Sequence, residues 1–211
     1  MLEDANTVAT RARATVLAGY AGDLDAVLAA RSDPDPSVQA RAVAAAARLG
    51  RRTVPDRVRD LRDEHAEVRR RACELESRAP RRSVRVNAAL TCCLDDPDAL
   101  VVVAAADALG EVAAASAVPA LAATAASHDD PRCREAAIAA LGAIGDPLGL
   151  EAVLGGLGDK PAVRRRAVVA LSAFTGDVVE AALERALEDR DWQVREVAQA
   201  LLAVDDDERA R

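Results

Sequence analysis

Apolar and polar positions along this chain follow the period of an α-helix, and the pattern returns about every thirty residues. The clearest unit spans residues 129–146 and reads DDPRCREAAIAALGAIGD. Asp130 can accept hydrogen bonds from the free N–H groups at a helix start, and Pro131 fits the first turn, where its missing N–H would be unpaired anyway. The apolar positions that follow lie on one helix face; they are Cys133, Ala137, Ala140, Leu141 and Ile144. This unit therefore predicts one complete amphipathic helix, which glycines then end.

Seven related helices emerge when each unit is aligned on the position of Cys133. Consecutive anchor positions are 30 to 33 residues apart, and the anchors are Val8, Val38, Val68, Val101, Cys133, Val163 and Val194. Four residues after each anchor stands an alanine. Three residues before each anchor stands the predicted cap, which reads Ala5, Asp35, His65, Asp98, Asp130, Lys160 and Asp191. Because alanine is small, the repeated stripe predicts helices whose backbones pack closely.

Weaker apolar-periodic segments lie between these helices and predict a first helix for each unit. They are Asp23–Arg31, Thr53–Arg62, Ser83–Leu94, Ser116–Ala126, Pro147–Leu157 and Asp177–Glu188. No segment shows the alternation of a strand. The expected fold is all-α, with a lone helix near residues 6–18 followed by six helix pairs. We expect a single repeat domain over residues 1–204 and an acidic, flexible tail over residues 205–211, because acids at a helix C-terminus oppose its dipole.

A period near thirty with two helices per unit is typical of α-solenoids. The residues resemble the HEAT repeat, in the short form found in phycobilisome lyase subunits. The resemblance is carried by the 129–146 unit, by DKPAVRRRAVVALSA at 159–173, by AVPAL at 117–121 and by DRDWQVREVAQALL at 189–202. It implies a right-handed α-α superhelix whose second helices line the concave side.

The resemblance also implies that a recurring Asp pairs with the Arg after the anchor of a neighbouring unit. The matching arginines are Arg69, Arg134, Arg164 and Arg195, whereas Ala9, Gln39 and Val102 depart from the pattern. We therefore interpret these four arginines as structural. The second repeat fits worst, because Glu76 stands at a core position.

Charge is distributed unevenly along a chain whose formal net charge is −7. Residues 51–94 carry twelve arginines against seven acids, whereas residues 95–211 carry eleven bases against twenty-two acids. The overall acidity argues against general affinity for nucleic acids or membrane surfaces. Only one Trp, one Tyr and one Phe are present, so aromatic stacking on bases has little support.

Metal, cofactor and catalytic signatures are missing from the sequence. The four cysteines form no C-x-x-C pair and only two histidines are present, so we expect no metal and no cofactor. His65 and His128 lie at repeat boundaries without a nucleophile, and we expect no enzymatic activity. The acidic N-terminus lacks the apolar run of a signal peptide, and free cysteines favour a reducing cytoplasm.

A helical projection places the face opposite the core at anchor+2, anchor+6 and anchor+9, with anchor+5 at its edge. The candidate partner-binding residues on this concave face are Arg70, Arg71, Val103, Asp107, Glu135, Arg165, Arg166, Val169 and Glu196. The edge positions are Val43, Cys73, Ala106, Ile138 and Val168. Small apolar side chains with isolated charges are typical of a surface that binds a protein segment. We therefore expect a scaffold or adaptor with an unidentified protein partner.

Other interpretations of these features stay open at this point. The concave face can be covered by stronger curvature or by a second copy of the chain. The arginine-rich segment 51–94 suggests nucleic-acid binding, as in the HEAT-like solenoids that are DNA glycosylases. Lys160 replaces a capping Asp and leaves N–H groups freer for an anion. Trp192 is either an exposed anchor for a partner or packs against the preceding helix.

Overall fold

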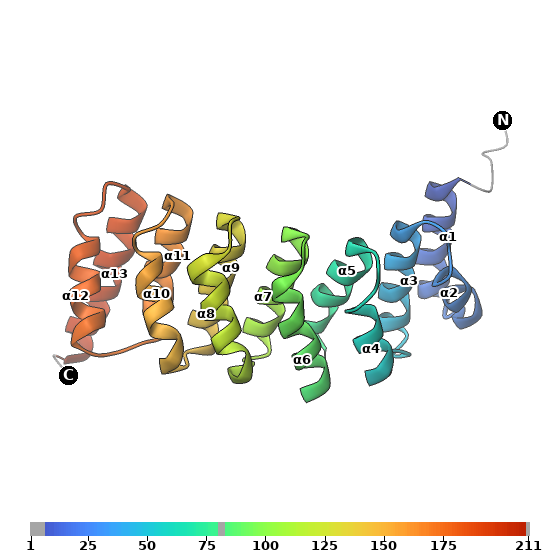
Figure 1. The fold of residues 1–211 in the computed structure, drawn as a ribbon, viewed down its shortest axis with the longest axis horizontal. Helices are drawn as coiled ribbons and strands as arrows, with labels where there is room; N and C mark the ends of the chain where they lie inside the picture. The colour runs from blue at the N-terminus through green and yellow to red at the C-terminus, as the bar shows by residue number, and fades with distance from the viewer. Residues whose placement is uncertain (1–6, 80–82, 210–211) are drawn as a thin grey trace.

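The computed structural model describes residues 7–79 and 83–209, and within these ranges helices are the only regular elements. Thirteen α-helices of this described part follow one another in a row of pairs, and the two chain ends lie at opposite ends of the molecule (Figure 1). The fold is the all-α solenoid that the sequence predicts.

The helices alternate between two roles, as expected from the repeat. First helices are α2 (Leu24–Ala30), α4 (Val54–Asp60), α6 (Val84–Cys92), α8 (Val118–Ser127), α10 (Leu150–Gly156) and α12 (Asp177–Ala186). Second helices are α1 (Val8–Ala21), α3 (Pro36–Arg48), α5 (Ala66–Glu76), α7 (Ala99–Glu111), α9 (Pro131–Ile144), α11 (Pro161–Leu171) and α13 (Trp192–Arg209). Short 3-10 turns, η1 (Cys93–Asp95), η2 (Ala115–Ala117) and η3 (Pro147–Gly149), adjoin three first helices. Helix α13 continues beyond residue 204, where the sequence predicted the end of the helical part.

Predicted aspartates cap several of the second helices, and α1 at the N-terminal end is an exception. The carboxylates of Asp35, Asp98 and Asp130 each accept a hydrogen bond from the backbone N–H two residues later, at 2.8–2.9 Å. These bonds satisfy donors that have no partner within the helix. For α1 the cap is Thr7, not the predicted Ala5, which lies outside the described residues.

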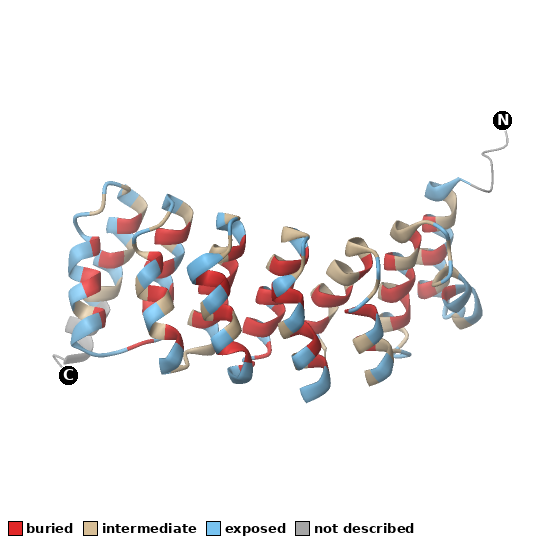
Figure 2. Cartoon of the chain, viewed as in Figure 1, coloured by how far each residue is buried: buried red, intermediate tan, exposed pale blue. Residues whose placement is uncertain are grey.

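The repeating stripe is buried between the two rows of helices (Figure 2). From the second unit onward every anchor is at most 2% exposed; these residues are Val38, Val68, Val101, Cys133, Val163 and Val194. The aligned alanines, from Ala12 to Ala198, are at most 6% exposed. Val8 is the exception at 40%, because among the described residues no helix precedes α1 to cover it. The core is thus built from Val, Leu and Ala.

Neighbouring second helices pack more closely than neighbouring first helices. An ideal Cβ on Gly142 of α9 would lie only 2.7 Å from the Cβ of Ala170 on α11. On Gly110 of α7 it would lie 3.0 Å from the Cα of Ala140 on α9. Since the more tightly spaced row of a curved solenoid forms its inner side, we assign the second helices to the concave side.

Gly142→Ala should lower the free energy of unfolding by about 1–3 kcal/mol, because the added methyl group meets the backbone of α11. Gly155→Ala in α10 is the matched control, since its Cβ would meet no atom within 4 Å. Both changes gain helix propensity, so Gly155→Ala should be neutral or stabilising by up to about 1 kcal/mol. Thermal and urea unfolding of the two variants checks this; equal effects would contradict close packing of α9 on α11.

Candidate functional site

A ladder of Arg–Asp pairs joins consecutive units at the loop before each second helix. Both oxygens of Asp96 accept from Arg69, at 2.6 and 2.9 Å. Arg134 donates in the same way to Asp159, at 2.6 and 2.7 Å, and Arg164 to Asp189, at 2.8 Å for both bonds. Each of these three arginines also donates to a backbone carbonyl of the loop before its own helix. The predicted structural role is confirmed for these three arginines.

Arg195 follows the last anchor, and no later unit offers it a carboxylate. Its guanidinium donates instead to the backbone oxygen of Asp189, 2.7 Å away. The ladder lowers the pKa of its carboxyl groups: the hydrogen bonds from Arg134 and Arg164 hold the pKa of Asp159 and of Asp189 below the usual range, against the opposing effect of burial.

The ladder arginine is missing at Ala9, Gln39 and Val102, and the last of these interrupts the ladder between α7 and α9. Val102 is fully buried. Asp129 stands four residues before the anchor of the next unit, as Asp159 does in its own unit, but α7 offers it no arginine. His128, one position earlier, accepts a hydrogen bond through Nδ1 from the N–H of Asp130 at 3.0 Å.

On the concave face, all four predicted arginines are already paired. Glu74 accepts from Arg70 at 3.1 Å and forms an ion pair with Arg71 at 2.7 Å. Arg166 lies 3.6 Å from Glu135. Arg165 donates to Gln193 and lies 3.7 Å from Asp191.

The remaining predicted concave residues differ in exposure. Asp107, Val169 and Glu196 are exposed, with Val169 at 43%. Val103 is half-buried and packs against the core. Among the described residues, Asp107 and Glu196 have no ion-pair partner. This face therefore offers carboxylates and small apolar groups more than free arginines.

The predicted edge of this face is wrong. Val43, Cys73, Ala106, Ile138 and Val168 are all at most 2% exposed. Ala40, which the same projection places on the floor, is only 4% exposed. The projection treats each helix alone, whereas adjacent second helices lie so close that each covers the flank of the next. The exposed strip is consequently narrower than predicted.

Two adjoining hollows lie on the concave face where α5, α7 and α9 meet. One has a volume of about 320 Å³ and includes Val103, and the other has about 500 Å³ and includes Ala139. They share Ser77, Arg78 and Asp107. Loss of hydration among the three helices raises the pKa of the Asp107 carboxyl, and the nearby Glu111 adds to this while Arg166 opposes it.

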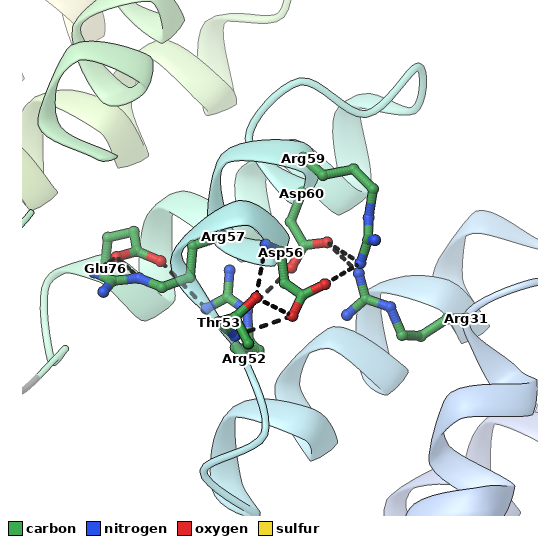
Figure 3. A network of polar contacts seen from close by, with 8 residues as sticks. All are labelled: Arg31, Arg52, Thr53, Asp56, Arg57, Arg59, Asp60 and Glu76. Atoms are coloured by element: carbon green, nitrogen blue, oxygen red, sulfur yellow. Dashed lines mark hydrogen bonds and ion pairs between the residues drawn. The ribbon is translucent and has the colours of Figure 1, made fainter. Parts of the chain in front are cut away.

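Several arginines of segment 51–94 form ion pairs inside the protein (Figure 3). Glu76 is 1% exposed and accepts from Arg57 Nε at 2.9 Å and from Arg52 at 3.2 Å. Arg52 also bonds to the buried Asp60 at 3.0 Å, which accepts from Arg31 as well. The poor match of the second repeat therefore reflects a buried ionic network in place of an apolar core.

The described arginines of segment 51–94 that lack a side-chain partner are exposed and come from separate elements. They are Arg51, Arg62, Arg78 and Arg85. Arg78 lines the concave hollows, whereas Arg51 and Arg62 lie in loops and Arg85 lies on α6. They do not gather into one patch of the size that segment 51–94 suggested.

Other candidate chemistry is sparse in the part of the chain described. Cys73, Cys93 and Cys133 are buried and Cys92 is exposed, all as free thiols. Burial raises the pKa of the Cys133 thiol to about 11. Residues 7–79 and 83–209 bring together no group of three His, Cys, Asp or Glu side chains that could hold a metal ion. Within the same ranges, no helix has both the length and the apolar character needed to cross a bilayer.

Comparison with solved structures places the chain among repeat solenoids. It is similar to a designed armadillo repeat protein in complex with the peptide (KR)4, with 17% identity, a TM-score of 0.63, and coverage of 86% of this chain and 98% of that one. It is also similar to human deoxyhypusine hydroxylase, with 26% identity, a TM-score of 0.52, and coverage of 82% and 70%. An engineered protein aligns at 20% identity and a TM-score of 0.64, over 86% and 97% of the two chains.

No curated protein sequence matches the chain. The family model of HEAT repeats matches residues 86–162, which run from within α6 to the first residues of α11. The matched stretch contains the unit at 129–146 that the sequence pattern singled out. A part of the chain thus matches the family model of HEAT repeats, and the solved structures show that the whole has the fold of a helical repeat solenoid.

Proposed function

We propose that this protein is a non-catalytic scaffold that binds a segment of a protein partner along its concave side. The observation that carries the proposal is the pair of adjoining hollows across α5, α7 and α9. Together they form a continuous recess that shares Ser77, Arg78 and Asp107. A recess that crosses successive units fits an extended chain better than a compact small molecule, because each unit offers it a similar contact.

The chemistry of the recess supports recognition of a mixed segment. Val103, Ala139 and Ala143 offer apolar contacts, and Asp107 and Glu111 have no cation partner among the described residues. A partner side chain that carries a positive charge would pair with these carboxylates in competition with Arg78, which lines both hollows, and with Arg166, which lies near Asp107. The designed armadillo protein with a similar fold binds the peptide (KR)4, which adds support for a basic segment. Buried free thiols fit a cytoplasmic location.

The exposed residues Asp107 and Val169 allow a direct test. A partner would first be identified by co-purification from the native cell, and its affinity for the purified protein would then be measured. Asp107→Arg combined with Val169→Glu should weaken binding about tenfold or more, equivalent to about 1.4 kcal/mol. The matched control is Val178→Glu combined with Glu184→Arg on α12, in the first-helix row, and it should bind like wild type. Equal affinity of both double variants would rule out the concave face.

Nucleic-acid binding through segment 51–94 is not favoured by any specific observation. Arg52, Arg57 and Arg69 make buried or half-buried ion pairs within the chain. We therefore expect a labelled DNA or RNA duplex to show no retardation by this protein even at low salt. Binding that weakens steeply with added salt would contradict this expectation.

A further inference from the structure

A second kind of hollow lies in the first-helix row, away from the concave face. It is an open recess of about 830 Å³ between α8 and α10. Alanines and glycines form its floor, among them Ala122, Ala125, Ala152 and Gly155. An ideal Cβ on Gly155 would meet nothing within 4 Å, so the missing side chain leaves this space open.

The hollow lies one junction beyond the interruption of the Arg–Asp ladder at Val102, and the intact pair of Arg134 and Asp159 lines it. Its rim includes Asp129, which has no ladder arginine because Val102 stands in the arginine position of the preceding unit. Departures from an otherwise regular pattern tend to collect at functional sites. Here Asp129, which has no ladder partner, lines the hollow between units five and six, and Gly155 of α10 contributes no side chain to fill it.

The charged side chains on the rim of the hollow indicate which kind of ligand group fits it. Arg134 is paired with Asp159 at 2.6 Å, so its guanidinium is not available to an anion. Asp129 and Glu151 are exposed on the rim, and neither side chain has a cation partner among the described residues. His128 Nδ1 accepts from a backbone N–H, which puts the hydrogen of the neutral ring on Nε2. The rim is therefore negative over an apolar floor.

We propose that the hollow between α8 and α10 receives a long basic side chain, arginine or lysine, of a partner segment. The aliphatic stem packs on the alanine and glycine floor, and the cationic head reaches the carboxylates of Asp129 and Glu151. A purely apolar occupant would leave these carboxylates desolvated without a partner, which costs free energy. This site is separate from the concave recess and does not depend on it.

The test is a titration of the full-length ¹⁵N-labelled protein, followed by ¹H–¹⁵N correlation NMR. The probes are N-acetyl-arginine methylamide and, as an uncharged analogue of its aliphatic stem, N-acetyl-norleucine methylamide. The arginine probe should cause saturable shifts at the amides of Ser127, Asp129, Gly155 and Gly158. Because the probe is small, we expect a Kd on the order of millimolar. The norleucine probe should bind at least about fivefold more weakly.

Variants separate the site from a general effect of charge. Asp129→Asn combined with Glu151→Gln should abolish the preference for arginine, and Gly155→Met should block both probes by filling the hollow. Glu184→Gln combined with Glu188→Gln removes two exposed acids on or next to α12 and should bind like wild type.

Four results would overturn the proposal. They are no saturable shift, equal binding of norleucine, unchanged arginine binding in the Asp129/Glu151 variant, or shifts centred on Asp107 of the concave face. Sedimentation of the protein alone addresses a second copy as the source of the basic side chain. Self-association that disappears in the Asp129/Glu151 variant would replace the partner segment by a dimer.

Discussion

Replacing Glu76 by alanine should destabilise the protein by about 3–5 kcal/mol, because it leaves buried guanidinium groups without their carboxylate. Glu76 is 1% exposed and binds both Arg52 and Arg57 (Figure 3). Arg52 Nη2 is already buried without an acceptor in the described part of the chain. The loss would be measured by urea denaturation followed by circular dichroism.

Two further variants separate charge from volume at this position. Glu76→Gln keeps an acceptor of similar size and should cost less than Glu76→Ala. Replacing Arg52, Arg57 and Glu76 together by leucine should recover much of the loss, since well-packed apolar groups can replace a buried ion pair without penalty. A cost below about 1 kcal/mol for Glu76→Ala would mean that the network is not a structural unit.

Arg164→Ala should cost about 2–3 kcal/mol, the second-largest effect that we expect. The side chain of Arg164 is 5% exposed, and its removal leaves the Asp189 carboxylate and a loop carbonyl without their donor. Arg166→Ala, in the same run of three arginines, is the matched control. Its guanidinium is 44% exposed and lies 3.6 Å from Glu135, so its loss should cost less than about 0.5 kcal/mol.

The effect of Arg164→Ala should depend on pH in a defined direction. The hydrogen bond from Arg164 lowers the pKa of Asp189 in the folded protein. A lowered folded pKa contributes stability that is present above the unfolded value, near about 4, and is lost as pH falls through the folded pKa. The gap between wild type and variant should therefore narrow below about pH 4. A gap that is constant across this range would show that Arg164 acts by packing alone.

The repeat pattern predicted most of the fold because each unit places similar residues at the same positions of its second helix. The anchor residues and the alanines four positions later are buried, as the pattern predicts. Every first helix lies within or close to its predicted range. Val8 was the exception, since the pattern alone does not say that the first unit lacks a covering helix. The Arg–Asp ladder was also predicted, because the resemblance to HEAT repeats implies it.

The surfaces were predicted less well, for a physical reason. A projection of one helix does not include the neighbour that covers its flank, so Ile138 and Val168 were placed at the edge of the groove although they are fully buried. The hollow between α8 and α10 depends on side chains that are absent at Gly155 and its neighbours. Its one signal in the sequence was Val102 in the arginine position of the ladder, which leaves Asp129 unpaired, and this signal can be recognised only when the ladder itself is known.

The buried ionic network around Glu76 also differs from what the sequence suggested. From the sequence, twelve arginines between residues 51 and 94 suggested a basic surface. The charges of Arg52, Arg57 and Arg69 are directed inward or toward the next unit, where they replace apolar packing. A local excess of charged residues therefore predicts a binding surface only when these residues do not form ion pairs inside the protein.

Hydrogen exchange of the complex with its co-purified partner tests the central claim most directly. If the concave side holds the partner, amide protection should increase in the second helices α5, α7 and α9, with little change in α2, α4 and α12. Protection confined to the first-helix row, with α5, α7 and α9 unchanged, would contradict the account.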